Sequence, residues 1–286
     1  EAHLRALVEA DLPFVKTRVP LEEAIDYFKQ KGYEDKIRLL EHRDKPYLIL
    51  YSLGDQRDYH HGYMVPSTRY LKWFKLTKLE DGFVMRFPRR HRPTEILPLP
   101  DFTTLLNTFR QYGDWLQRLG IDNVGTLNQA ICENRSRELI LVSEALHESR
   151  ISEIANHIVE RINDIRVVLI AGPSSSGKTT FSKRLSIQLL SRGISPFPLE
   201  MDKYFVDREM TPRDENGEFN FETIKAVNTK RLSEDLGHLI AGEQVQLPHF
   251  DFIAGTSKPG DTVQLAPGQI IILEGIHGLN PELVPN

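Results

Sequence analysis

Hydrophobic positions in residues 1–90 follow helical spacing at first and strand spacing afterwards. Helices are predicted near residues 4–8, 21–28 and 37–40, where apolar side chains recur every three or four positions. Pro20 precedes the second helix and Gly32 follows it, which is typical of a helix start and stop. Strands are predicted over residues 47–53, 70–79 and 82–86, with a hairpin turn at 80–82. This order of elements predicts a small α+β domain.

Longer helical patterns follow the α+β region. A helix is expected over residues 102–119, with Asp101 as its N-cap and Gly120 after its end. A second pattern, with many apolar pairs at i, i+3 and i, i+4, extends from about residue 126 to about residue 162. We therefore expect a helical linker in this part of the chain.

Short apolar runs alternate with a helix in the second half of the chain. Strands are predicted over residues 166–171, 196–201 and 269–273, and a helix over residues 181–192. Strands that alternate with helices predict an α/β fold with a doubly wound parallel sheet. We place the boundary near residue 150, so that 1–150 is the smaller α+β domain with its linker and 151–286 is the α/β domain.

The composition is that of an ordinary globular protein, with 40% hydrophobic and 27% charged residues. The 36 Lys and Arg residues against 40 Asp and Glu give a net charge of −4, which argues against a chain dominated by nucleic-acid binding. A single cysteine, Cys132, excludes an intrachain disulfide framework and favours the cytoplasm. No apolar run approaches the roughly 18 residues of a membrane span, so no membrane partner is expected. The oligomeric state is left open, a homo-oligomer included.

One segment carries a phosphate-binding motif. Residues 172–179 match G-x-x-x-x-G-K-[ST] between a predicted strand and a predicted helix. In this setting glycines let backbone N–H groups surround phosphate oxygens, Lys178 reaches the β- and γ-phosphates, and Thr179 coordinates Mg²⁺. The predicted ATP-binding residues are Gly172, Pro173, Ser174, Ser175, Ser176, Gly177, Lys178, Thr179 and Thr180. The alternative is a glycine-rich connector that binds nothing.

Two acidic residues follow predicted strands of the α/β half. Asp202 comes after the strand at 196–201, and the carboxyl ends of parallel strands form the ligand-binding edge of such a sheet. Asp202 could there accept a proton from an attacking hydroxyl or hold a metal, and the alternative is an N-cap of the following turn. Glu274 follows an apolar strand and is expected to organise Mg²⁺, the alternative being a structural carboxylate.

Residues 166–286 resemble the N-terminal part of the uridine kinase and phosphoribulokinase family of P-loop kinases. The matching segments are GPSSSGKTT at 172–180, MDKYFVDRE at 201–209, GEFNFET at 217–223, VQLPHFDF at 245–252 and IILEGIHGLNP at 271–281. The resemblance implies ATP-dependent phosphorylation of a hydroxyl, typically a nucleoside 5′-hydroxyl, with Mg²⁺. It also implies that Asp202 is the catalytic base, that Lys178 acts on the phosphates, and that the acceptor contacts Tyr204, Glu222 and Phe250.

Two positions depart from the family pattern. Glu222 stands where the family usually has Asp, and Gly255 stands where uridine kinases have a base-contacting His. The acceptor is therefore left open among nucleosides, uridine- or cytidine-like, and related small molecules. The family's arginine-bearing lid would come later in the sequence, so we expect native sequence beyond residue 286 and little or no activity of 1–286 alone.

Residues 1–90 resemble the second additional domain of threonyl-tRNA synthetases. The segments LGDQRDYHHGYMVPST at 53–68 and YLKWFKL at 70–76 carry the resemblance. In synthetases this module hydrolyses mischarged tRNA with a His-x-x-x-His and a Cys-x-x-x-His pair. His60 falls at the Cys position and Met64 at the second His position, and a thioether is a poor substitute for imidazole at a water-activating metal. We expect an accessory or substrate-positioning role rather than an editing site.

The densest positive cluster contains Arg86, Arg89, Arg90, His91 and Arg92. Such a patch could contact phosphates of RNA, and the alternative is a solvated loop. The leading hypothesis is thus an ATP-dependent kinase with a small-molecule acceptor. The alternative is an RNA-associated P-loop NTPase whose nucleotide site acts as a switch. A sugar-phosphate kinase would need cations for the substrate phosphate, and residues 200–260 show no clear set.

Overall fold

A computed structural model describes residues 1–79, 82–99, 103–214, 216–280 and 283. The chain forms two compact units, Glu1–Leu139 and Ile140–Asn286, and each is described by itself. The division lies about ten residues before the boundary that we placed from the sequence, a difference typical of such predictions. The hairpin turn expected at 80–82 and the N-cap expected at Asp101 include residues outside the described ranges.

The first unit contains five complete helices and five strands among its described residues. The helices are α1 (Ala2–Glu9), α2 (Leu21–Lys31), α3 (Glu34–Glu41), α4 (Thr103–Arg118) and α5 (Val124–Cys132). The strands are β1 (Val15–Pro20), β2 (Tyr47–Leu53), β3 (Gln56–Tyr59), β4 (Lys75–Leu79) and β5 (Gly82–Arg86), and one short 3₁₀ turn is η1 (Thr68–Tyr70). The predicted helices near 4–8, 21–28 and 37–40 are confirmed.

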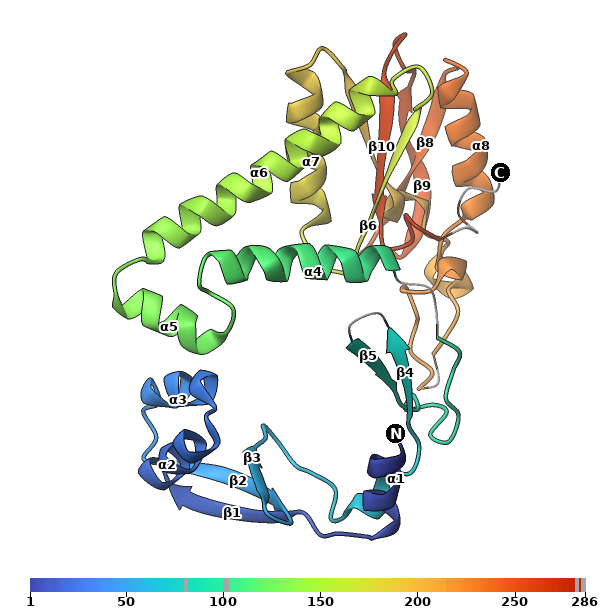
Figure 1. The fold of residues 1–286 in the computed structure, drawn as a ribbon. Coiled ribbons are helices and arrows are strands. Elements are labelled where there is room, and N and C mark those ends of the chain that lie inside the picture. The colour runs from blue at the N-terminus through green and yellow to red at the C-terminus, as the bar shows by residue number, and fades with distance from the viewer. Residues whose placement is uncertain (80–81, 100–102, 215, 281–282, 284–286) are drawn as a thin grey trace. The chain divides into compact units, whose positions relative to one another are not determined.

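An antiparallel sheet of order β1-β2-β3 packs against α2 and α3 (Figure 1). Its core is formed by one face of the sheet and the inner faces of the two helices: Val19, Ala24, Phe28, Ile37, Leu40, Leu48 and Leu50. Gly32 ends α2 in the left-handed conformation, φ 71°, which glycine adopts without steric cost. Strands β4 and β5 form a separate hairpin, with β4 shorter than the strand predicted over 70–79.

The helical pattern predicted over 126–162 is two helices in the structure. Helix α5 begins with a capping box between Asn123 and Thr126, and α6 (Ser136–Glu160) follows after a break. Asn134 lies in that break with φ 63°, a conformation that asparagine tolerates better than most residues. Helix α5 approaches α3 closely, because a Cβ on Gly125 would lie 2.9 Å from Arg38 Cβ and 3.0 Å from Asp35 O.

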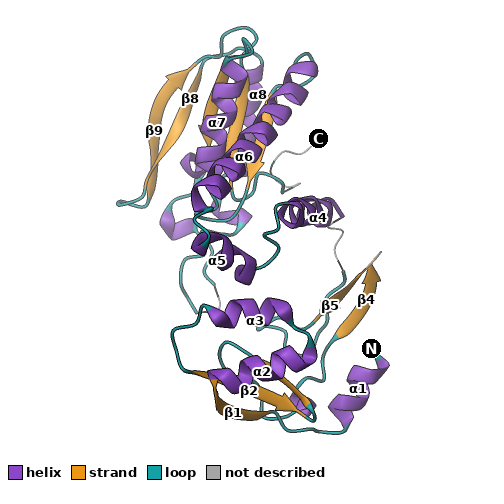
Figure 2. Ribbon diagram, turned by 60° about the vertical axis from the view of Figure 1, so that its left-hand side comes forward, coloured by secondary structure: helices purple, strands orange, loops and turns teal. Residues whose placement is uncertain are grey.

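The second unit contains most of α6 and the elements that follow it. These are β6 (Val167–Ala171), α7 (Lys178–Leu190), β7 (Pro196–Glu200), η2 (Met201–Tyr204), η3 (Arg208–Met210), η4 (Ile224–Ala226), α8 (Thr229–Ile240), β8 (Val245–Asp251), β9 (Thr256–Val263) and β10 (Ile270–Gly275). Strands β8 and β9 pair as an antiparallel hairpin (Figure 2).

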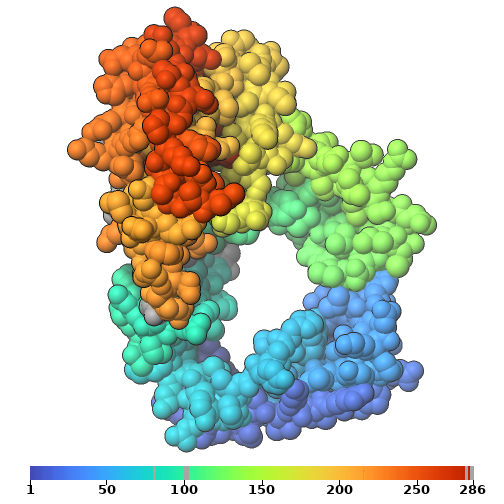
Figure 3. Space-filling model, turned by 180° about the vertical axis from the view of Figure 1, so that it is seen from behind, coloured from blue at the N-terminus to red at the C-terminus, as the bar shows by residue number. Residues whose placement is uncertain are grey.

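A parallel sheet of order β6-β10-β7 forms the centre of this unit. Successive residues of β10 face opposite sides: Ile270 and Ile272 pack in one core with α6 and α7, whereas Ile271 and Leu273 pack in the other with α8. Figure 1 shows α7 and α8 on opposite sides of the sheet, and Figure 3 shows residues near 165–195, in yellow, beside the red C-terminal part. A parallel sheet between helical layers is the fold of a P-loop kinase, as predicted.

Polar side chains join α6 to α7 along the first of these cores. Arg192 donates to Asn156 Oδ1 at 2.7 Å and to Ser152 Oγ at 2.6 Å, and Gln188 Nε2 donates to Glu148 Oε1 at 2.7 Å. Because α7 begins directly after the predicted phosphate loop, these bonds help to fix the helix that would carry the nucleotide.

Candidate nucleotide-binding site

The predicted phosphate loop joins the end of β6 to the start of α7. Ser175 has φ 60° and Gly177 has φ 88°, so the loop turns through two left-handed residues. A Cβ on Gly172 would lie 2.6 Å from Ser176 Oγ and 3.3 Å from Lys178 Cγ, which explains why glycine is needed there. Lys178 Nζ donates to Pro173 O at 3.0 Å, so its ammonium group lies over the loop. This is the geometry in which a helix N-terminus and a lysine can bind phosphate.

Thr179 and Glu274 meet at the base of the loop. The Thr179 hydroxyl donates to Glu274 Oε1 at 2.9 Å, and Glu274 is only 8% exposed. Its second oxygen, Oε2, is buried and has no hydrogen-bond partner among the described residues. A buried carboxylate oxygen without a partner is costly, and Mg²⁺ prefers oxygen ligands of this kind. The side chains present therefore fit the Mg²⁺ ion that the motif implies.

Asp202 lies in η2, directly after β7. The residue is exposed overall, but neighbouring protein atoms partly desolvate its carboxyl group, which raises the pKa of that group. The positive charge of Lys178 acts in the opposite direction, and the negative charge of Glu200 adds to the rise of the pKa. Since the charge of Lys178 acts on Asp202, the predicted phosphate-binding lysine and the predicted base lie near each other at the same edge of the sheet. A carboxyl group in this position is suited to accept a proton.

The end of β10 and the turn that follows it lie very close to the end of β6 and to the residue that follows β7. A Cβ on Gly275 would lie 2.5 Å from Met201 Cβ, next to Asp202, and a Cβ on Gly278 would lie 2.8 Å from Ile170 O, just before the phosphate loop. Sequence reasoning missed both glycines. The signal that could have found them is the G-x-x-G spacing directly after Glu274. His277 lies between them, and its buried Nε2 has no partner among the described residues.

The three residues predicted to contact the acceptor differ in burial: two are buried and one is exposed. Tyr204 and Phe250 are 1% and 3% exposed and belong to the core with α8, where they pack rather than face an open surface. Burial and the nearby Asp235 carboxylate raise the pKa of Tyr204. Glu222 is exposed. Two of the three predicted contacts are thus core side chains in this conformation, because the aromatic residues complete the packing below the sheet edge.

Two features of the first unit were singled out from the sequence, the histidines of the synthetase-like segment and the positive cluster. Among the described residues no group of three or more His, Cys, Asp or Glu side chains could hold a metal ion. In the positive cluster, Arg86 donates to Leu97 O at 2.7 Å and Arg92 contacts Glu95 at 3.2 Å, so two of its arginines are engaged within the protein. None of the described helices is long and apolar enough to cross a membrane.

A phosphate loop on a parallel sheet, with carboxylates at the ends of the neighbouring strands, defines a P-loop nucleotide-binding domain of the kinase type. Residues 167–286 match the model of the "Phosphoribulokinase / Uridine kinase family". The comparison thus supports a P-loop kinase domain of that family in the second unit. It says nothing of residues 1–166, and the resemblance of residues 1–90 to a synthetase module remains a prediction.

Curated relatives match stretches of similar length. A uridine kinase of Brevibacillus brevis is 32% identical over 117 residues, 41% of this chain and 53% of that protein. A uridine kinase of Halobacterium salinarum is 30% identical over 115 residues, 40% of this chain and 49% of that protein. A solved structure of a possible uridine kinase from Bacillus stearothermophilus is 31% identical, with a TM-score of 0.41, over 48% of this chain and 75% of that one. The chain spans about half the length of the curated relatives it matches.

Proposed function

We propose that this protein is an ATP-dependent kinase that transfers the γ-phosphoryl group to a hydroxyl of a nucleoside or a related small molecule. The observation that carries the proposal is the arrangement of Lys178, Glu274 and Asp202 at the ends of three adjacent parallel strands or the loops that follow them. The nucleotide's phosphates and an acceptor hydroxyl would meet at this edge.

The phosphate loop has the simplest role in this proposal. Residues 172–180 bind the phosphates through backbone N–H groups and the α7 N-terminus, and Lys178 exchanges its bond to Pro173 O for phosphate oxygens. Thr179 and Glu274 would hold Mg²⁺, which would neutralise charge on the phosphates. Because Lys178 is positioned before the nucleotide arrives, little reorganisation is needed.

Asp202 is the residue we assign as general base. Its raised pKa strengthens it as a proton acceptor, and its ionised form would take the proton of the attacking hydroxyl. A nucleoside as acceptor is supported by the uridine kinases among the relatives of the second unit. The departures at Glu222 and Gly255 leave the choice of base open.

Replacement of the base tests the proposal. Asp202→Asn should lower the rate of phosphoryl transfer by at least about 100-fold while ATP affinity changes little, because general bases contribute rate rather than nucleotide binding. Transfer is measured by ADP formation with a nucleoside acceptor, and ATP affinity by calorimetry. Glu209→Gln, an exposed carboxylate in the same segment, serves as matched control and should leave both unchanged. Acceptor-independent ATP hydrolysis that Asp202→Asn leaves intact would favour the nucleotide switch instead.

A further inference from the structure

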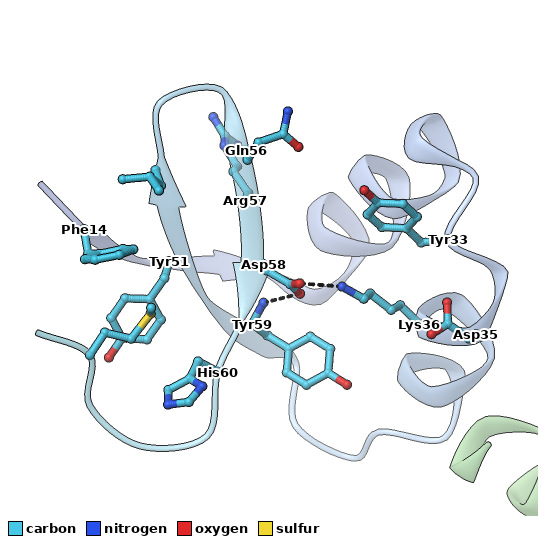
Figure 4. Close-up of a pocket in the computed structure, with 12 residues that line it drawn as sticks. Phe14, Tyr33, Asp35, Lys36, Tyr51, Gln56, Arg57, Asp58, Tyr59 and His60 are labelled. Carbon is cyan, nitrogen blue, oxygen red and sulfur yellow. Dashed lines mark hydrogen bonds and ion pairs between the residues drawn. The ribbon is translucent and has the colours of Figure 1, made fainter. Parts of the chain in front are cut away.

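The first unit contains a cavity of about 610 Å³ beside the edge strand β3. Aromatic rings from four places in the chain line it: Phe14, Tyr33, Tyr51 and Tyr59. Figure 4 shows Phe14 and Tyr51 on one side of β3 and Tyr33 with Lys36 on the other. Pockets of this size that combine rings with a few polar groups are typical small-molecule sites.

A close ion pair supplies the polar part of this cavity. Lys36 Nζ lies 2.6 Å from Asp58 Oδ2, and its position is fixed by rings, because the ammonium is 4.9 Å from the centre of Tyr33 and 5.2 Å from that of Phe28. The ammonium keeps N–H groups beyond the one directed at Asp58, so the pair offers hydrogen-bond donors beside a carboxylate acceptor. A planar ligand edge with adjoining C=O and N–H groups is complementary to it.

The other lining groups favour an uncharged ring. The charged lining side chains are two cations, Lys36 and Arg57, and two carboxylates, Asp35 and Asp58. Their charges balance, so the cavity does not favour a ligand with a net positive or negative charge. The Tyr51 hydroxyl already donates to Gly62 O at 3.0 Å, so Tyr51 offers its ring rather than its polar end. A neutral heteroaromatic ring can stack on Tyr33, which lies on the same side of β3 as Lys36 (Figure 4), while its edge reaches the ion pair.

A peptide strand is a poorer occupant of this edge. The Arg57 N–H donates to the Tyr27 hydroxyl at 3.0 Å, and the Tyr59 N–H donates to Asp58 Oδ1 at 2.8 Å. Backbone donors that are already satisfied cannot pair with an added strand. The cavity therefore suits a small molecule better than a chain segment.

We propose that this cavity binds a neutral nucleobase or nucleoside through ring stacking and the Lys36–Asp58 pair. The choice of uridine as probe rests on the proposed function, whereas the class of ligand follows from the cavity alone. The cavity would be a second nucleoside-binding site of this chain, and it lies in the unit that does not contain the phosphate loop.

Methionine methyl signals can test this, because Met64 lines the cavity and Met201 lies beside Asp202 in the other unit. In the ¹³C-methyl-methionine-labelled protein, without ATP, uridine should shift the Met64 signal to saturation; Met64→Leu assigns that signal. N3-methyluridine, which lacks the N–H of the edge, should bind about tenfold more weakly. This comparison uses the unaltered protein and so does not depend on a variant folding.

Lys36→Leu should weaken uridine binding at Met64 by about tenfold. Its control, Lys29→Leu, removes a lysine whose partner Asp26 is 3.8 Å away outside the cavity, and should bind within about twofold of the unaltered protein. A Met64 signal that uridine leaves unmoved would overturn the proposal, whether or not Met201 responds. Equal binding of N3-methyluridine would overturn recognition of the edge. A response at Met201 alone would leave the proposed kinase function intact, so the two failures are distinguishable.

Discussion

Single residues at the candidate site carry charge that the protein itself leaves partly uncompensated. Glu274 keeps one buried oxygen without a partner among the described residues, and Lys178 donates to the carbonyl oxygen of Pro173 in the loop. A buried polar group without a partner lowers the stability of the fold when no ligand is bound. Phosphate and metal would supply the missing partners and so stabilise the fold. The unsatisfied groups of this edge therefore mark where a ligand is expected.

The raised pKa of Asp202 predicts the pH dependence of the reaction. The base must be ionised, so kcat/KM for ATP should fall as the pH decreases through a pKa above the usual value of about 3.9 for aspartate. Glu200→Gln removes a negative charge that raises this pKa, and should move the acidic limb of the profile to lower pH by a few tenths of a unit. The measurement is the pH profile of each protein.

Glu234→Gln, on α8 and paired with Lys230 at 3.9 Å, is the control and should leave the limb in place. The assignment of Asp202 as the titrating base would be contradicted if Glu200→Gln moved the acidic limb of the kcat/KM profile to higher pH or left it in place.

At the scale of elements, the site depends on how closely the turn after β10 approaches its neighbours. Gly275, the last residue of β10, and Gly278, in the turn that follows, leave no room for a side chain, since Gly275 meets Met201 and Gly278 meets the backbone of Ile170. The β10 turn therefore holds the ends of β6 and β7 at a fixed separation. That separation sets the distance between phosphate loop and base.

Gly278→Ala should disturb this arrangement. The added methyl group would lie 2.8 Å from Ile170 O and 2.9 Å from Ile170 C, backbone atoms that cannot rotate away. We expect a loss of about 1–3 kcal/mol in the free energy of unfolding, the usual effect of overpacking, together with weaker ATP binding. Urea unfolding and calorimetry measure the two effects.

Gly237→Ala provides the matched control in the same unit. Gly237 lies in α8 with no atom within 4 Å of an added Cβ, so alanine should be neutral or stabilise by up to about 1 kcal/mol. If Gly278→Ala left the free energy of unfolding and ATP binding as unchanged as Gly237→Ala, the close contact between Gly278 and Ile170 would be contradicted.

The elements also show what the sequence can and cannot predict. The phosphate loop, the strand before it and the helix after it were predictable because their signals are local. Strands β1 and β3 were missed because they are polar and mostly exposed, without the alternation that identifies a strand. The break at Asn134 was missed because apolar periodicity continues on both sides of it. The G-x-x-G spacing marks Gly275 and Gly278 locally, but the atoms that each glycine contacts belong to residues distant in sequence, so the spacing does not give their role.

At the scale of the whole molecule, the chain joins two units of different architecture, one built on an antiparallel sheet and one on a parallel sheet. Helix α6 contains the point at which the two units divide. The first unit offers a neutral, ring-lined cavity, and the second offers a phosphate loop with its carboxylates.

The central claim is that the second unit transfers a phosphoryl group to a hydroxyl, and the products of the reaction test it most directly. With the full-length protein, ATP, Mg²⁺ and a panel of nucleosides, ³¹P NMR and mass spectrometry should find ADP and a nucleoside monophosphate in equal amounts. Lys178→Ala should form neither, because the phosphates lose their cation. ADP accompanied only by free phosphate, at a rate independent of any acceptor, would contradict the claim.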